Sequence, residues 1–206
     1  MVEQGTMEWK YQRAGKFTAS RFCDVLARSK KTGEPLKAYN DMLWSIVVER
    51  MTGEPIEGPD AFALQWGKDV EPYARNAYEL STGTIITLSE FVTHPAYPFV
   101  GASPDGLIGN KGGVEFKCPK NPGIHLERFL SGVPEEYKPQ IQGCMWVTGR
   151  EWWDFGSYDP RMPESHRLLV IRVHRDDAFI ATMAAAILEA EERVLELMDK
   201  IQRVAA

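Results

Sequence analysis

The segment from 103 to 117 constrains the fold of this chain more than any other part of the sequence. Short apolar-rich stretches lie on either side of residues 109–113, a dense cluster of residues that favour tight turns. This arrangement predicts a β-hairpin. Because side chains alternate faces along a strand, Glu115 and Lys117 should share one face while Phe116 points into the core.

The predicted hairpin carries residue types that suit the hydrolysis of a phosphodiester. Asp105 lies at the far end of the partner strand, where its carboxylate can share a metal ion with Glu115. Carboxylate oxygens, with the backbone carbonyl of Phe116 as a further ligand, suit Mg²⁺, which lowers the pKa of bound water and neutralises developing charge. Lys117 can orient or help to deprotonate that water, or stabilise the transition state as a point charge. A surface hairpin with an Asp-Gly turn and an exposed Glu-x-Lys pair is the alternative interpretation.

Several segments of the chain resemble those of one nuclease family. Pro104-Asp105 followed by Glu115-Phe116-Lys117 resembles the PD-(D/E)xK nuclease superfamily. More closely, the chain resembles the phage lambda exonuclease family, also called YqaJ-like alkaline exonucleases. The similar segments run in the family's order and span nearly the whole chain: 13–20, 66–75, 103–107, 115–119, 137–142, 145–148 and 158–162.

The resemblance implies roles for two polar residues that spacing alone would leave as ordinary exposed helix positions. Glu71 would line the metal site and contribute to metal binding. Gln140, in the first turn of a predicted helix, would donate a hydrogen bond to substrate phosphate or to the attacking water. Without the resemblance, a solvated glutamate and an exposed amide are the commoner interpretations.

The resemblance also implies a set of substrate-binding residues. Arg13 and Ser20, with Ser103 beside Asp105, would form a pocket for the 5′-phosphate of the strand being degraded. Spacing alone indicates no more than a surface arginine and a helix cap. Leu64 would wedge between the two strands ahead of the site, or else pack as a buried helix leucine.

Together these implications describe a Mg²⁺-dependent 5′→3′ exonuclease, with Mn²⁺ as an alternative metal, that acts on double-stranded DNA ends bearing a 5′-phosphate. It would release mononucleotides and leave 3′ single-stranded tails for an annealing protein in phage-type recombination. A ring-shaped homotrimer threaded by DNA is implied as well. The alternatives are an endonuclease of the same superfamily and a catalytically inactive DNA-binding module.

Composition is that of an ordinary globular domain. The 206 residues are 44% hydrophobic and 26% charged, and we expect a single domain over 1–206. The net charge of −5 argues against a protein that coats nucleic acid but not against a nuclease with acids at its centre. No apolar run reaches membrane-spanning length, no signal-peptide pattern opens the chain, and the three cysteines lack metal-site spacing. We therefore expect a cytoplasmic protein without a membrane partner, in a bacterial host cell if phage-encoded.

Periodicity and turn residues predict an α/β chain. A mixed central β-sheet flanked by helices, as in the restriction-endonuclease-like core, fits the order of the elements. The predicted helices cover 18–28, 36–51, 60–80, 138–149 and 176–204, with Thr18 and Asp60 as candidate caps of the first and third. The predicted strands cover 84–93, 99–108, 114–117, 151–158 and 167–174.

Overall fold

The computed structural model describes residues 2–56 and 62–205, with the side chains of 62–64 outside the description. Its α-helices are α1 (Met7–Arg13), α2 (Phe22–Val25), α3 (Lys37–Thr52), α4 (Phe62–Thr82), α5 (Pro122–Ser131), α6 (Lys138–Thr148) and α7 (Asp177–Ala205). Its strands are β1 (Phe17–Thr18), β2 (Val92–Thr93), β3 (Val100–Ala102), β4 (Gly106–Ile108), β5 (Gly112–Lys117), β6 (Trp152–Tyr158) and β7 (Leu168–His174). Short 3₁₀ turns are η1 (Ala19–Arg21), η2 (Glu135–Tyr137) and η3 (Glu164–His166).

The strands form two mixed sheets. The larger has the order β4-β5-β6-β7, and the smaller has the order β1-β3-β2. The predicted hairpin is present as β4 and β5, which pair antiparallel with Gly106 opposite Val114. Continuing that register by one residue sets Asp105 opposite Glu115. The fold therefore brings the two predicted metal-binding carboxylates to the same end of the hairpin.

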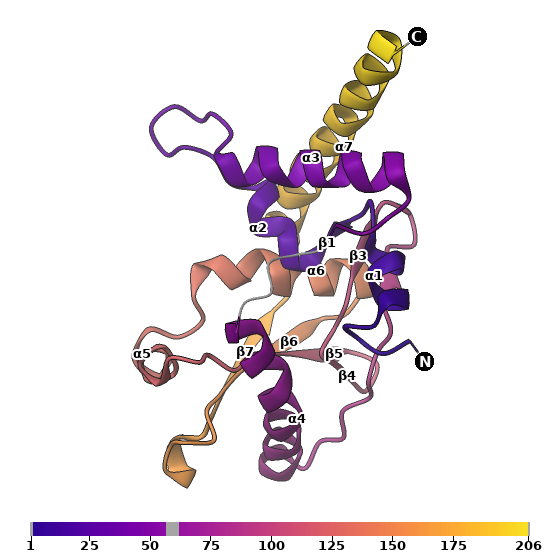
Figure 1. Cartoon of the computed structure of the whole chain (residues 1–206). Coiled ribbons are helices and arrows are strands. Elements are labelled where there is room, and N and C mark those ends of the chain that lie inside the picture. Colours follow the sequence, from indigo (N-terminus) through magenta and orange to yellow (C-terminus); the bar gives the residue numbers. More distant parts are fainter. Residues whose placement is uncertain (1, 57–61, 206) are drawn as a thin grey trace.

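Helices cover both faces of the larger sheet, as Figure 1 shows. On one face, Tyr78 of α4 packs edge-on against Phe116 of β5, with ring centroids 5.9 Å apart. On the other face, Trp153 and Phe155 of β6 join a larger apolar cluster with α6, α3 and α7. Since successive strand residues alternate faces, Glu115 points towards the α6 side while Phe116 points towards α4. The fold class predicted from the sequence, α/β with helices flanking mixed strands, is confirmed.

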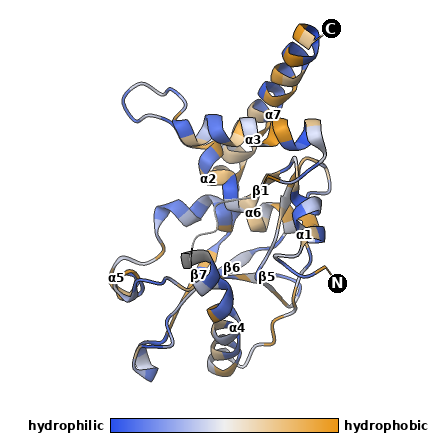
Figure 2. Ribbon diagram, viewed as in Figure 1, coloured by the Kyte–Doolittle hydropathy of each residue, from blue (hydrophilic) through white to orange (hydrophobic). Residues whose placement is uncertain are grey.

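Helix α7 shows the apolar side and the N-terminal cap that are typical of a helix packed against a core. The last predicted helix is present as α7, and it buries one side of its surface, with Ile180, Met183 and Ile187 fully or nearly fully buried. Figure 2 shows the resulting mixture of apolar and polar residues along α7. Asp176 begins this helix by accepting a hydrogen bond from the backbone N–H of Phe179 at 2.9 Å. Among the helices of residues 2–56 and 62–205, none has both the length and the apolar character that crossing a membrane requires.

Three predicted elements were wrong in extent. The strand over 84–93 is reduced to β2 and an isolated bridge between Thr87 and Leu107, because the Ile86 N–H bonds to the Glu79 side chain instead of to a strand. The helix over 18–28 shortens to η1 and α2, because the Thr18 hydroxyl accepts from Arg13 and makes no cap. The strand over 99–108 is interrupted after Ala102 and forms β3 and β4, which lie in different sheets. The candidate cap Asp60 lies outside the described residues.

Two helices were not predicted from the sequence. Helix α1 is short and begins where the Thr6 hydroxyl accepts from the Trp9 N–H. Helix α5 begins at Pro122, after Asn121 accepts from the Gly123 N–H at 2.9 Å. Both caps are visible in the sequence, but the short apolar patterns behind them are too weak to indicate a helix.

Candidate active site

The hairpin end gathers two carboxylates and a lysine. The buried side chains of Asp105 and Glu115 are 9% and 3% exposed. The backbone N–H of Phe116 donates to Asp105 Oδ2 at 2.7 Å and fixes that carboxylate against the strand. Lys117 Nζ donates to Glu115 Oε1 at 2.7 Å. The structure thus places the three hairpin residues singled out by the sequence in one contiguous group.

Gln140 joins this group from the start of α6. Its amide nitrogen donates to Glu115 Oε1 at 2.5 Å, and its amide oxygen accepts from Lys117 Nζ at 3.1 Å. The Tyr137 ring lies beneath the same ammonium, with its centroid 5.0 Å from Lys117 Nζ. Helix α6 begins at Lys138 with a proline in its first turn, and this start directs Gln140 at the strand end.

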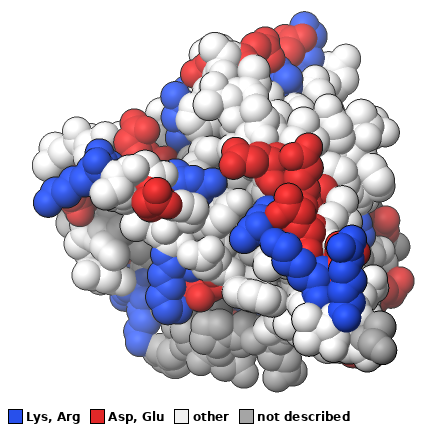
Figure 3. Space-filling model, turned by 90° about the horizontal axis from the view of Figure 1, so that it is seen from above, with Lys and Arg blue, Asp and Glu red and all other residues white. Residues whose placement is uncertain are grey.

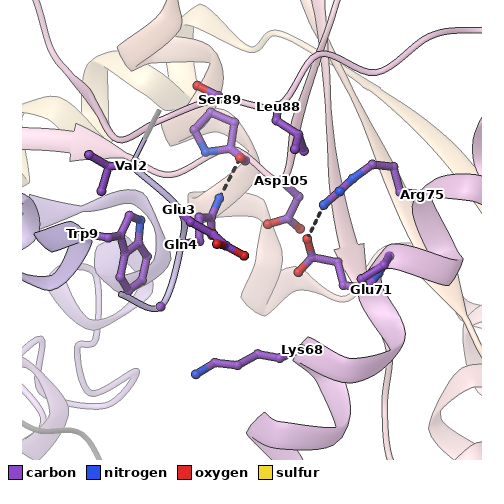
Figure 4. A pocket seen from close by; sticks show the side chains of 13 residues that line it. Val2, Glu3, Gln4, Trp9, Lys68, Glu71, Arg75, Leu88, Ser89 and Asp105 are labelled. Carbon is purple, nitrogen blue, oxygen red and sulfur yellow. Dashed lines mark hydrogen bonds and ion pairs between the residues drawn. The ribbon is translucent and has the colours of Figure 1, made fainter. Parts of the chain in front are cut away.

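Glu71 and Lys68 reach the group from α4. Two cavities of about 610 and 450 Å³ share Lys68, Glu71 and Asp105 as lining residues. Figure 4 shows the larger cavity, with the N-terminal segment on one side and α4 on the other. Here Arg75 donates to Glu71 Oε1 at 2.9 Å, one helical turn away. The acidic group therefore opens on both sides into space that a substrate can occupy.

Burial and neighbouring charges shift the pKa values of residues in this group. Burial raises the pKa of Asp105 well above its usual range, and the nearby carboxylates Glu115 and Glu71 raise it further. Burial, only partly opposed by Arg75, also raises the pKa of Glu71. Burial alone would lower the pKa of Lys117, but the carboxylates of Glu115 and Asp105 outweigh it and raise that pKa. Lys117 is therefore a protonated cation that partly balances an excess of negative charge.

The donor set fits a hard divalent cation. Glu115 Oε1 accepts two hydrogen bonds, whereas its buried Oε2 has no partner among the described residues. A buried carboxylate oxygen without a partner is costly unless a water or an ion satisfies it. In the same described part of the chain, no three His, Cys, Asp or Glu side chains are placed to hold a metal together. Asp105 and Glu115 are therefore the carboxylates that would hold such an ion, while Glu71 is paired with Arg75. The Phe116 carbonyl stays a predicted further ligand.

A second polar cluster surrounds Arg13 at the end of α1. Arg13 donates to Ser103 Oγ at 2.8 Å and to Ser20 Oγ at 3.1 Å, and its guanidinium stacks 4.2 Å from the Trp9 ring. Trp9 Nε1 also donates to Ser103 Oγ at 3.0 Å. Since a hydroxyl oxygen has two lone pairs and both are used, the Ser103 hydrogen is left to donate. Burial lowers the pKa of Arg13 to about 10, so the guanidinium stays charged at neutral pH.

The face of the molecule that Figure 3 shows does not form one basic field. On the face that Figure 3 shows, Lys and Arg side chains lie beside Asp and Glu side chains. This mixture is in keeping with the net charge of −5. On this face, attraction of an anion would depend on local groups of charged side chains and less on a long-range field.

Sequence reasoning missed three residues that the structure places at these clusters, and it named one that lies outside the description. Trp9 stands four residues before Arg13, so helical spacing could have indicated their contact. Lys68 and Tyr137 lie within segments used for the family resemblance, but neither has a distinguishing local pattern. The side chain of Leu64 is outside the described residues, so its assignment as a wedge stays a prediction.

Comparison with known proteins identifies the family. The sequence profile of the YqaJ-like viral recombinase domain matches residues 8–151. The chain belongs to this family. Its structure is similar to that of an alkaline exonuclease (LHK-Exo) from Laribacter hongkongensis, with a TM-score of 0.88 and 36% identity over 97% of this chain and 98% of that one. The resemblance recognised in the sequence is confirmed, and family membership supports a nuclease role.

The chain is also similar to other proteins, in fold or over part of its sequence. LHK-Exo has also been solved in complex with dAMP. A phage related exonuclease from Haemophilus somnus 129PT has a TM-score of 0.70 at 16% identity, covering 90% of this chain and 96% of that one, a likeness of fold alone. The uncharacterized protein ExoD of Escherichia coli K12 is 30% identical over 72 residues, which are 35% of this chain and 82% of ExoD.

Proposed function

We propose that this nuclease is a Mg²⁺-dependent 5′→3′ exonuclease that acts on double-stranded DNA ends, releases mononucleotides and leaves 3′ single-stranded tails. The observation that carries the proposal is the closeness of two sites along the chain. Ser103, which accepts from Arg13, stands two residues before Asp105 of the acidic group. Two residues of extended chain span at most about 7 Å, so neighbouring phosphates of one strand can reach both sites.

The acidic group is suited to Mg²⁺, with Mn²⁺ as a substitute. Asp105, Glu115 and the Phe116 carbonyl would hold the ion, and Glu71 is a further carboxylate at the same cavities. When bound, such an ion lowers the pKa of a water molecule and neutralises charge that develops on the phosphate oxygens. Glu115 Oε2, a buried oxygen without a partner in the described part of the chain, supports this assignment.

The protein's own side chains then position the reacting groups. Lys117, held between Glu115 and Gln140, presents protons to the scissile phosphate and to the attacking water. Gln140 keeps one amide proton for the same purpose, because its amide donates once to Glu115. Arg13, with the hydroxyls of Ser20 and Ser103, would bind the 5′-phosphate and so set which strand is cut and in which direction.

Assembly and partners follow from the resemblance to the lambda exonuclease family. A homotrimeric ring and a single-strand annealing protein that receives the 3′ tail are proposed on that basis. The LHK-Exo complex with dAMP supports a single nucleotide as the product. The chain is also proposed to act as one domain over its full length.

Digestion of linear and circular duplexes tests the proposal. With Mg²⁺, a linear duplex carrying 5′-phosphates should yield mononucleotides, a covalently closed circle should resist, and EDTA should stop the reaction. Cleavage of the circle would favour the endonuclease alternative. No cleavage of any duplex with Mg²⁺ or Mn²⁺ would favour an inactive DNA-binding module.

Asp105→Ala is the matching variant for the metal assignment. It should lose activity through weaker metal binding, and raising the Mg²⁺ concentration should restore part of that activity. A variant that digests DNA normally at low Mg²⁺ would remove Asp105 from the ligand set.

A further inference from the structure

The turn next to Arg13 is held in place by hydrogen bonds to the backbone of Gly15. This residue lies between α1 and β1 in the left-handed region, with φ +70°. Its N–H donates to Glu49 Oε2 at 2.8 Å, and its carbonyl accepts from Arg50 Nε at 2.8 Å. A Cβ at this position would lie 2.8 Å from Arg50 Cγ, so the turn touches the α3 side chain directly. Both backbone polar groups of one turn residue are thus held by the end of α3.

Arg50 is itself anchored to the long C-terminal helix. Its two terminal nitrogens donate to both carboxylate oxygens of Glu191 at 2.9 and 2.7 Å. The pair is largely buried, with side-chain exposures of 17% and 13%. Helices α3 and α7 pack against each other, as Figure 1 shows, so this two-pronged contact is fixed by the core on both sides. A fork of this kind permits little rotation of the guanidinium.

Arg13 and its partner Ser20 lie on either side of this turn along the chain. Arg13 precedes Gly15 by two residues, and its partner Ser20 follows Gly15 by five. We infer that Glu49, Arg50 and Glu191, here named the Gly15 clamp, position Arg13 against its hydroxyl partners and so determine how well the enzyme discriminates a 5′-phosphate from a 5′-hydroxyl end. The inference rests on the proposed 5′-phosphate role of Arg13. The clamp residues act through the turn and touch no substrate.

The clamp acts because phosphate recognition depends on the exact distance between fixed donors. A guanidinium that shifts by about one ångström relative to its partner hydroxyls loses aligned contacts, and displacements of this size can cost up to about a hundredfold in rate. An end without a phosphate makes no such contacts and is indifferent to the shift. Loosening the clamp should therefore slow digestion of phosphorylated ends selectively.

The experiment compares two duplexes that differ only at the 5′ end. Digestion rates with Mg²⁺, and end binding in EDTA followed by fluorescence anisotropy, are measured on 5′-phosphorylated and 5′-hydroxyl duplexes. Arg50→Ala should reduce the phosphate preference roughly tenfold. Glu191→Gln leaves the Gly15 bond but frees the arginine, and it should reduce the preference less. The ratio within one preparation cancels any loss of folded protein.

Two further variants separate positioning from general stability. The exchange of Arg50→Glu with Glu191→Arg restores an ion pair, but a carboxylate cannot donate to the Gly15 carbonyl. Thermal stability should recover in this double variant while the phosphate preference stays reduced. Glu196→Gln makes the same chemical change on α7 in an exposed pair with Arg193, and it should leave the preference unchanged.

The outcomes distinguish the clamp from the proposed function. If the wild type prefers phosphorylated ends and Arg13→Ala abolishes the preference, while Arg50→Ala and Glu191→Gln retain it in full, the clamp inference is overturned and the proposed function stands. Return of the preference in the charge-exchanged variant also overturns the inference. A wild type without any preference overturns the Arg13 assignment and the clamp together.

Discussion

Tyr78→Phe should destabilise the fold without removing any proposed active-site group. The Tyr78 hydroxyl donates to Asp154 Oδ2 at 2.6 Å, and the two residues are 1% and 2% exposed. Burial, together with the neighbouring Asp154, raises the pKa of Tyr78, so its hydroxyl remains a donor at neutral pH. A hydrogen bond to a charged acceptor contributes about 1.5–3 kcal/mol. Phenylalanine keeps the ring against Phe116, and Arg172 still pairs with Asp154, so the loss should stay within that range.

Thermal unfolding measures the effect. For a chain of this length, 1 kcal/mol shifts Tm by about 2–4 °C, so Tyr78→Phe should lower Tm by roughly 3–12 °C. Tyr73→Phe is the matched control, because the same hydroxyl is removed from the same helix at a side chain that is 64% exposed. Digestion at 25 °C should stay near the wild-type rate, because Arg75 continues to hold Glu71. Equal Tm values for the two variants would refute the reasoning.

Three more predictions concern the site, the sheet and assembly. Lys117→Ala should lose nearly all cleavage but still bind duplex ends in Ca²⁺, because the role proposed for its ammonium is in the reaction and not in the fold; near-normal digestion with Mg²⁺ would contradict this. Gly113→Ala should greatly reduce soluble folded protein, since its Cβ would lie 2.3 Å from the Trp153 ring. Gly67→Ala, where no described atom lies within 4 Å of the added Cβ, should be tolerated in thermal melts, and equal stability of the two variants would count against the packing argument. Light scattering after gel filtration should show a trimer, and a mass near the 23.3 kDa of one chain at micromolar concentration would exclude it.

Local signals explain which elements could be predicted from the sequence. The hairpin at 103–117 is specified by adjacent turn residues and alternating strands, so its register follows from the segment itself. The apolar stripe of α7 likewise repeats over many turns. By contrast, β2 pairs with residues 101 and 102 of β3, and its two-residue length depends on where β3 lies. Such a strand is determined by its partner, and no local pattern indicates it.

The residues of the candidate site also fall into two groups: those that local sequence patterns bring together, and those that meet only in the folded chain. Asp105, Glu115 and Lys117 could be grouped by strand alternation and hairpin pairing alone. Gln140 arrives from a helix 23 residues further along than Lys117, and only family resemblance pointed to it before the structure placed the two side chains 3.1 Å apart. Residues that meet through tertiary packing leave no common spacing in the sequence, which is why Tyr137 and the Gly15 clamp were not foreseen.

The acidic group is a local source of instability that the rest of the sheet offsets. Asp105 and Glu115 are buried close together, and one oxygen of Glu115 has no partner among the described residues, an arrangement that costs folding free energy in the absence of a cation. On the opposite face of the sheet, Tyr78 and Arg172 satisfy both oxygens of the buried Asp154. One strand therefore carries a fully bonded carboxylate that stabilises the fold, while its neighbour carries a carboxylate with one oxygen that no described residue satisfies. Such an exception to the rules of a stable core is typical of a functional site. We accordingly expect binding of a divalent cation to stabilise the chain as well as to support its chemistry.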